Sequence, residues 1–524
     1  SNVSDGSIGI GKSALAALTS GAGNTAVGYQ ALMTEDTGPY STAIGHSALK
    51  IQDNANGKNT AVGYNSQIST SAGQQNTSVG NLSMQLIGGS SANNNVAIGN
   101  LSMQSSGTIT DNVAANNTAV GADSLKAITL GLQNVAVGSS AGVGITTANK
   151  CVLLGSYAGD AITVTNSATS DGTVAVGYEA LTSLTSGIKN TAVGYQALYS
   201  NSLRSDTTAI GYQALYTVAG SNRNTAVGSL AGYSSAGNDC VYVGRNAGQF
   251  TGDADGTTAI GKDALMSLTS NKITGVNNTA IGRSSGTNIV GAGHENTLLG
   301  ALSGATLTTG SDNTLIGKSA DTDDATAINQ TVIGHSTTGV ADNSVTIGNA
   351  DVTAVYMASD SGAVVHAGGL DIGTPSTGSD GLLVNSNMEL YSYLAGTGSQ
   401  AHVIFNNANG DVGSIDTSGS ATAYNTSSDY RLKENEVLIS DGLTRLNKLK
   451  PYRFNFKVDD SKTVDGFFAH EVAEVVPEAI TGEKDAVDDS GKIITQGIDQ
   501  SKLVPLLVKA VQELTARVKE LEKK

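Results

Sequence analysis

Most of the chain repeats one short arrangement of apolar and polar positions. In each repeat a small apolar run is followed by glycine, then by a second run that often ends in leucine, and then by a connection rich in Ser, Thr, Asn and Gly. The nine residues NTAVGYQAL stand at 24–32 and again, unchanged, at 190–198. Self-similarity of this kind predicts a repeat architecture.

The central glycines give the period of the repeat. They lie at positions 11, 28, 45, 63, 80, 99, 121, 138, 155, 177, 194, 211, 228, 244, 261, 282, 300, 317, 334 and 348. Eleven of the nineteen spacings are 17 residues, and the others run from 14 to 22. A run such as Thr25–Val27 cannot bury a face alone, so it must stack on its neighbours. The pattern predicts a mainly β chain in which residues 1–350 form a solenoid shaft of about 20 rungs, hydrogen-bonded at ~4.8 Å.

Three positions of the repeat have two interpretations each. The recurring glycine either turns the backbone or lets another chain approach closely. Asn at the start of many rungs predicts a hydrogen-bonded ladder rather than a binding site. Tyrosines directly after the glycine predict a stacked ladder along the rod, with an exposed sugar-binding strip as the alternative. These tyrosines are Tyr29, Tyr178, Tyr195 and Tyr212.

The two cysteines indicate neither a disulfide nor a metal site. Cys151 and Cys240 both stand four residues before a rung glycine and are five rungs apart. At one rung spacing each they are separated by roughly 24 Å, whereas linked Cα atoms lie within about 7 Å. We predict buried free thiols. No metal-ligand motif and no cofactor motif is found, and loop acids such as Asp253 and Asp321 are interpreted as solvated.

After Asp351 the period stops. Residues 351–427 contain the short β-type runs AVYMA, GLLVN, MELYSYL, HVIFNNANG and VGSI, with a turn signal at 409–410. This segment is predicted to be a small all-β connector or tip. Residues 428–524 differ in composition, since they hold four of the six Phe and 16 of the 29 Lys and Arg.

Charge narrows the function classes. The chain has 29 Lys and Arg against 45 Asp and Glu, a net charge of −16. This balance argues against non-specific nucleic-acid binding and against a polybasic membrane-surface segment. No run of 18 apolar residues is present, so no membrane insertion is predicted.

Four sequence blocks in the last segment carry a family resemblance. They are NTSSDYRLKEN (425–435), LNKLKPYRFNF (446–456), DGFFAHEVAEVVPEAI (465–480) and SKLVPLLVKAVQELTARVKELEKK (501–524). In this order they resemble the endosialidase-type intramolecular chaperone domain of phage tail spikes and fibres. The repeats resemble the head repeats of trimeric autotransporter adhesins and, more closely, the Asn-Thr-Ala-x-Gly-Tyr repeats of phage tail fibres. Adhesin heads have a shorter period, so a one-chain roll and an intertwined trimer both remain open.

The resemblance implies a self-cleaving Ser–Lys pair, here Ser428 and Lys433. A serine hydroxyl needs a base to become a nucleophile, and a desolvated lysine can be that base. Five residues on a turn or short helix bring the two together, or Lys433 acts on a neighbouring chain. Asp429 and Arg431 are predicted to orient this loop. His470, which assists proton transfer or makes a structural hydrogen bond, and the supporting Glu471 lie in the third block.

Ring size predicts the cleaved bond. The Ser428 hydroxyl reaches the carbonyl of Ser427 through a five-membered ring, whereas its own carbonyl requires a strained four-membered ring. Cleavage is predicted between Ser427 and Ser428, with the Ser428–Asp429 bond as the alternative.

The final segment, 501–524, is predicted to be a helix with one apolar stripe. The stripe consists of Leu503, Leu507, Ala510, Leu514, Val518 and Leu521. Either this helix packs on its own domain or, as we favour, it forms a short coiled-coil seam between chains.

Three functions fit these patterns. The first is a homotrimeric phage tail fibre or spike, located in the virion tail, that binds a bacterial surface polysaccharide or protein. The second is a trimeric adhesin at a cell surface that uses the same assembly domain. The third is a depolymerase that cleaves a capsule polysaccharide.

Overall fold

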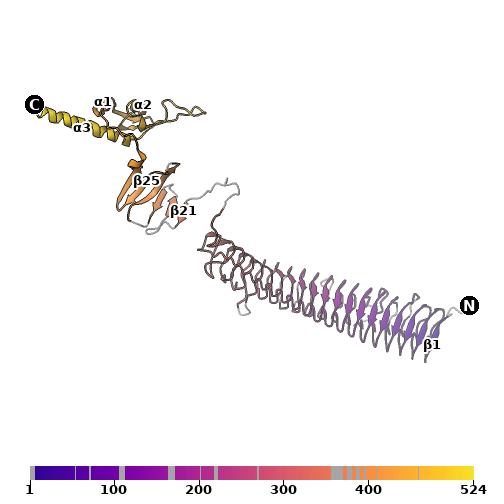
Figure 1. Ribbon diagram of the computed structural model, residues 1–524. Coiled ribbons are helices and arrows are strands. Elements are labelled where there is room, and N and C mark those ends of the chain that lie inside the picture. Colours follow the sequence, from indigo (N-terminus) through magenta and orange to yellow (C-terminus); the bar gives the residue numbers. More distant parts are fainter. Residues whose placement is uncertain are drawn as a thin grey trace. The chain divides into compact units, whose positions relative to one another are not determined.

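The computed structural model describes residues 6–524 apart from 53–54, 70–71, 106–111, 163–170, 201, 204, 218–221, 268–270, 356–369, 374–380, 385–389, 395–396, 409 and 458. The chain is mainly β and divides into two compact units, Ser1–Ser361 and Gly362–Lys524. Figure 1 shows the short strands of the first unit stacked side by side.

In its described residues, the first unit is a parallel β-solenoid of 20 three-residue strands in one sheet. The strands are β1 (Ile8–Ile10), β2 (Thr25–Val27), β3 (Thr42–Ile44), β4 (Thr60–Val62), β5 (Thr77–Val79), β6 (Val96–Ile98), β7 (Thr118–Val120), β8 (Val135–Val137), β9 (Val152–Leu154), β10 (Val174–Val176), β11 (Thr191–Val193), β12 (Thr208–Ile210), β13 (Thr225–Val227), β14 (Val241–Val243), β15 (Thr258–Ile260), β16 (Thr279–Ile281), β17 (Thr297–Leu299), β18 (Thr314–Ile316), β19 (Thr331–Ile333) and β20 (Val345–Ile347). Every strand directly precedes a rung glycine, so the predicted solenoid is confirmed.

Each strand pairs with the next strand of the same chain in one constant register. In β11 and β12, for example, Thr191 lies opposite Thr208 and Ala192 opposite Ala209. Thus a single chain forms the roll, and the strands do not require intertwined chains. The middle residue of the strand points inward and is fully buried, as at Ala192.

The rung glycine has the backbone conformation of a turn, and it also permits a close approach, although not the predicted approach of another chain. Gly194 has a φ of +135°, a region that favours glycine, and a Cβ there would lie 2.3 Å from the carbonyl oxygen of Gly211. The close neighbour is the next rung of the same chain. Four residues later a leucine with positive φ fills the core, as Leu198 does at 52°.

Tyr242 replaces the usual alanine at the centre of β14. Its ring is fully buried, and its hydroxyl is hydrogen-bonded to Ser235 Oγ at 2.8 Å and Thr251 Oγ1 at 2.7 Å. Room for the ring comes from Gly232 and Gly248, which stand at the position where leucine is the commonest residue. A Cβ at these glycines would approach the ring to 2.6 and 2.2 Å, respectively.

The connector region contains two antiparallel sheets. One is formed by β21 (Leu370–Gly373), β22 (Gly381–Val384) and β23 (Leu390–Tyr393), the other by β24 (Gln400–Asn407), β25 (Gly410–Ser418) and β26 (Ala421–Thr426). The predicted turn at 409–410 joins β24 to β25, although Asn409 itself lies outside the described residues. The AVYMA run (354–358) also lies partly outside them. The three-segment division of the chain remains a prediction.

The C-terminal part is α+β. Its elements are η2 (Tyr430–Leu432), α1 (Gly442–Leu446), β27 (Tyr452–Phe456), β28 (Asp459–Gly466), α2 (Ala469–Ala473), η3 (Pro477–Ala479), β29 (Ile480–Thr481), β30 (Gly497–Ile498), η4 (Gln500–Leu503) and α3 (Val504–Leu521). A small core of Val472, Val476, Ala479, Leu503 and Leu506 holds α2, η3 and α3 together.

The predicted apolar stripe is buried at only two of its six positions. Leu503 in η4 and Ala510 in α3 are 5% and 0% exposed, whereas Leu507, Leu514, Val518 and Leu521 are 44%, 53%, 44% and 69% exposed. The N-terminal half of α3 therefore packs on its own domain, as one interpretation predicted. The coiled-coil seam remains a prediction for the exposed half.

Candidate functional site

The strongest candidate site is a serine and a lysine joined by a short 3-10 turn. Ser428 follows β26, and η2 turns the chain so that Lys433 Nζ donates a hydrogen bond of 2.7 Å to Ser428 Oγ. The turn is closed by the amide of Lys433, which donates to the carbonyl of Tyr430 at 3.1 Å. The spacing of five therefore brings both side chains together within one chain. Both are exposed to solvent there.

Asp429 and Arg431 shape this turn. The Asp429 carboxylate caps η2 by accepting from the Arg431 amide at 2.8 Å, and it accepts from Arg431 Nη2 at 2.6 Å. The hydrogen bonds from the Arg431 side chain and amide lower the pKa of Asp429. A deprotonated cap is what holds the loop between Ser428 and Lys433 in this conformation.

Ser428 and Lys433 line a cavity of about 400 Å³. Its other walls come from the segment before η2, from α1, from η3 and from the start of α3. The charged residues among them are Arg445, Glu478 and Lys502. Arg445 is fixed by donating to the carbonyl of Val475 at 2.7 Å. Elements that are far apart in sequence thus line one cavity together with Ser428.

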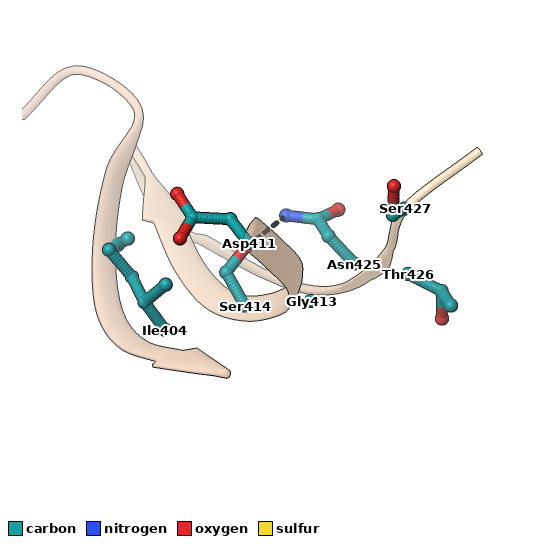
Figure 2. A pocket seen from close by; sticks show the side chains of 8 residues that line it. Ile404, Asp411, Gly413, Ser414, Asn425, Thr426 and Ser427 are labelled. Atoms are coloured by element: carbon teal, nitrogen blue, oxygen red, sulfur yellow. Dashed lines mark hydrogen bonds between the residues drawn. The ribbon is translucent and has the colours of Figure 1, made fainter. Parts of the chain in front are cut away.

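Ser427, on the other side of the predicted cleavage point, is tied to the preceding sheet. Its amide donates to the carbonyl of Val412 at 3.1 Å. Ser427 also lines a second cavity, of about 290 Å³, beside β24 and β25 (Figure 2). There Asn425 Nδ2 donates to Ser414 Oγ at 3.3 Å (Figure 2). The Ser427–Ser428 bond therefore connects the last strand of the sheet to the turn that holds Lys433.

His470 and Glu471 lie on α2 and do not line the cavity of Ser428 and Lys433. The His470 ring stacks on Phe468 with centroids 6.0 Å apart. Glu471 accepts hydrogen bonds from Lys450 Nζ at 3.2 Å and Tyr452 at 3.3 Å. Burial raises the pKa of Glu471, but these partners outweigh it and the net pKa is lowered. In the described chain both residues make structural contacts, and their roles at the Ser428 site remain predictions.

The tyrosine ladder of the solenoid has the geometry of a stacked structural ladder rather than of a sugar-binding strip. Tyr178, Tyr195 and Tyr212 stack with centroids 5.5 and 5.4 Å apart and nearly parallel rings. They are also 44%, 43% and 50% exposed. Because each inner ring covers the faces of its neighbours, the ladder offers solvent mainly ring edges. Stacking a sugar on such a ladder requires a free ring face, which favours the structural interpretation.

The Asn ladder is built from buried, fully engaged amides. Asn134 Oδ1 accepts from the amide of Cys151 at 3.0 Å, and its Nδ2 donates to the carbonyl of Ala148 at 2.8 Å. Cys151 and Cys240 are buried free thiols, as predicted. Burial raises the pKa of Cys151 to about 12, so this thiol is not a nucleophile at neutral pH.

One cluster was not anticipated from the sequence. His294, Glu295 and Asp312 place one ligand atom each within 4.8 Å of one another. They come from adjacent rungs. The only sequence signal for this proximity is that His294 and Asp312 are 18 residues apart, close to one period of the repeat. Exposed acidic groups commonly gather in this way without a metal ion. Among the described helices, none combines the length and apolar character that a membrane span requires.

Repeats, site and C-terminal fold together define a β-solenoid protein with a C-terminal α+β domain. Residues 428–481 match the family described as chaperone of endosialidase. The chain is also similar to the long tail fiber protein Gp37 of Enterobacteria phage K3, with 33% identity over 125 residues, which is 23% of this chain and 10% of that protein. The Gp37 protein of Enterobacteria phage T2 matches at 33% over 125 residues, or 9% of its length. The matched part thus spans about one tenth of these relatives.

Proposed function

We propose that the chain is a homotrimeric phage tail fibre or spike that takes part in adsorption to a bacterial surface. Its C-terminal domain assembles the trimer and then cleaves itself from the fibre between Ser427 and Ser428. The hydrogen bond of 2.7 Å from Lys433 to Ser428 carries the proposal, because it joins a nucleophile to a base next to the predicted bond. The match to the chaperone family and the similarity to tail fibre proteins support it.

The chemistry is an acyl shift followed by hydrolysis. A neutral Lys433 amine takes the Ser428 hydroxyl proton, and Ser428 Oγ attacks the Ser427 carbonyl carbon through a five-membered ring. The lysine returns the proton to the Ser428 nitrogen as the C–N bond breaks, which leaves an ester between Ser427 and Ser428 Oγ. Water then hydrolyses this ester to a Ser427 carboxylate and a free Ser428 with its hydroxyl and amine. The Ser428–Asp429 bond is the alternative.

In this scheme a second chain would remove Lys433 from solvent. A lysine acts as a base when burial disfavours its charged form, yet Lys433 is exposed in the single chain. The exposed apolar half of α3, at Leu514, Val518 and Leu521, provides a face for chain association. Trimer assembly would then cover the site and start cleavage only after the fibre has formed.

The test is the denatured intact mass of freshly expressed protein. Wild-type protein should give two fragments divided after residue 427. Ser428→Ala and Lys433→Met should remain one chain, and Ser427→Ala is the matched control, since its hydroxyl has no part in the reaction and it should still be cut. Native mass should show a trimer. An uncut wild-type chain, or a cut Ser428→Ala variant, contradicts the proposed cleavage.

A further inference from the structure

The C-terminal third of the solenoid carries a line of cations on an otherwise acidic rod. Between residues 224 and 427 the chain has only five Lys and Arg, and four of them share the position directly after a rung glycine. We call this line the basic column. It consists of Arg245, Lys262, Arg283, Lys318 and the histidine His335, with Ala301 at the one interruption. The fifth cation, Lys272, lies elsewhere.

The backbone register places these positions on one line. In successive rungs the amide two residues after a glycine donates to the carbonyl one residue after the preceding glycine. Asp263 donates to Arg245 at 2.9 Å, Ser284 to Lys262 at 2.8 Å, and Ser336 to Lys318 at 2.9 Å. At the same position in the rungs of β10–β12, directly after the rung glycine, the rings of Tyr178, Tyr195 and Tyr212 stack with centroids 5.5 and 5.4 Å apart. The basic column therefore extends over roughly 24 Å at ~4.8 Å per rung.

The column is exposed and mostly unneutralised. All five side chains are exposed. Lys262 lies 3.4 Å from Asp263, whereas Arg245, Arg283 and Lys318 form no ion pair with the residues that the structure describes. Among the acids of these rungs, Asp239 and Glu295 precede the strand, whereas Asp263 follows it, one residue after Lys262. Like charges in a row repel one another, so a polyanion that lies along them would relieve this repulsion.

We propose that the basic column binds a linear anionic polysaccharide lying along the rod. A straight row of cations at a constant spacing suits a linear polymer with repeated carboxylate or phosphate groups better than a compact acidic protein. The inference rests on the proposed function, because adsorption is what would bring the rod against such a glycan. A single-stranded nucleic acid fits less well, since binding it generally relies on aromatic faces, and the column itself has no aromatic residue other than His335.

Binding to immobilised polygalacturonate, with neutral dextran and an oligothymidylate as comparison probes, tests the inference on the full chain. The column variant carries Arg245→Gln, Lys262→Gln, Arg283→Gln and Lys318→Gln. The matched control removes the same charge outside the column, by Lys50→Gln, Lys58→Gln, Lys150→Gln and Lys189→Gln. Three of these control sites have φ of +66°, +57° and +58°, and glutamines occupy the equivalent rung position at Gln75 and Gln133 with +59° and +60°. The control should therefore fold.

We expect wild-type and control proteins to bind polygalacturonate, more weakly at about 200 mM than at about 50 mM salt, and the column variant to lose at least about tenfold in affinity. A variant with Arg245→Lys and Arg283→Lys should keep most of the binding. Equal binding by the column variant and the control, or tighter wild-type binding to oligothymidylate, overturns the inference. Trimer formation and cleavage are measured on the same preparation, so a failure of the proposed function can be distinguished from a failure of polysaccharide binding.

Discussion

Tyr242 allows a quantitative test of how the solenoid core is filled. Replacement of Tyr242 by alanine restores the residue that most rungs have at the strand centre, but it empties a site whose surroundings have lost their leucines. Gly232 and Gly248 stand at the leucine position, and their ideal Cβ atoms would lie 2.6 and 2.2 Å from the ring. The variant therefore leaves a cavity that neither neighbouring rung can fill. Removal of a buried aromatic side chain costs ~3–5 kcal/mol.

Because a solenoid opens locally, the loss of stability in Tyr242→Ala should be measured near β14 rather than from a global unfolding curve. The amide of Gly244, which donates to Val227 at 2.8 Å, is a suitable reporter in native-state hydrogen exchange. At 1.4 kcal/mol per tenfold change, Tyr242→Ala should lower its protection by roughly 100- to 4,000-fold. Amides of β2–β4, many rungs away, should be unaffected.

A compensating variant makes the reasoning refutable. Tyr242→Ala combined with Gly232→Leu and Gly248→Leu rebuilds an ordinary rung. Leucine is tolerated at this backbone conformation, since Leu198 and Leu215 have φ of +52° and +49°. We expect the triple variant to recover most of the protection. Unchanged protection of the Gly244 amide in Tyr242→Ala would refute the idea that the Tyr242 ring fills the space left by Gly232 and Gly248. Equal protection in the triple variant and in Tyr242→Ala would refute it as well.

Three further outcomes follow from buried or capping polar groups. Asn134→Ala should destabilise its rung by about 1–3 kcal/mol for each partner left unsatisfied, at the Ala148 carbonyl and the Cys151 amide; local hydrogen exchange measures this. Burial, the largest cause, raises the pKa of Glu35 above 4.5, so its contribution to stability is greatest below pH 4.5 and falls as the pH rises through the raised pKa. Proteolysis of the first rungs across this range should therefore depend less on pH in Glu35→Gln. Hydrogen bonds from the first amides of α1 lower the pKa of Glu513, so its stabilisation is present above pH 4.5 and lost as the pH falls through the lowered pKa. Thermal unfolding of the C-terminal domain should be less acid-sensitive in Glu513→Gln.

The rungs were predictable because every rung buries the same positions of the repeat. Burial of Ala192 and its equivalents forces a small residue before each glycine, and the close approach at Gly194 forces the glycine itself. Both constraints act within one repeat, so they are visible in the linear sequence. The positive φ of Leu198 was not predictable, because leucine ordinarily avoids that region and only closure of the rung imposes it.

Features that depend on neighbouring rungs or distant elements were not predictable in the same way. The match between Tyr242 and Gly232 joins two adjacent rungs and appears only once the register is known. In the C-terminal part, five residues separate Ser428 from Lys433, so a local turn is enough to join them. The separation of His470 from that pair depends on how α2 packs against α3. Glu513 caps α1 across 71 residues, which no local pattern indicates.

Because each strand contacts only the strands immediately before and after it, the solenoid has no fixed number of rungs. Thr191 pairs with Thr208 in the same way as Thr25 pairs with Thr42, so a rung placed at either location meets equivalent neighbours. The identical NTAVGYQAL at 24–32 and 190–198 is what duplication and recombination of whole repeats would leave behind. Such exchange in the gene would lengthen or shorten the solenoid in steps of one rung while leaving the C-terminal domain unchanged.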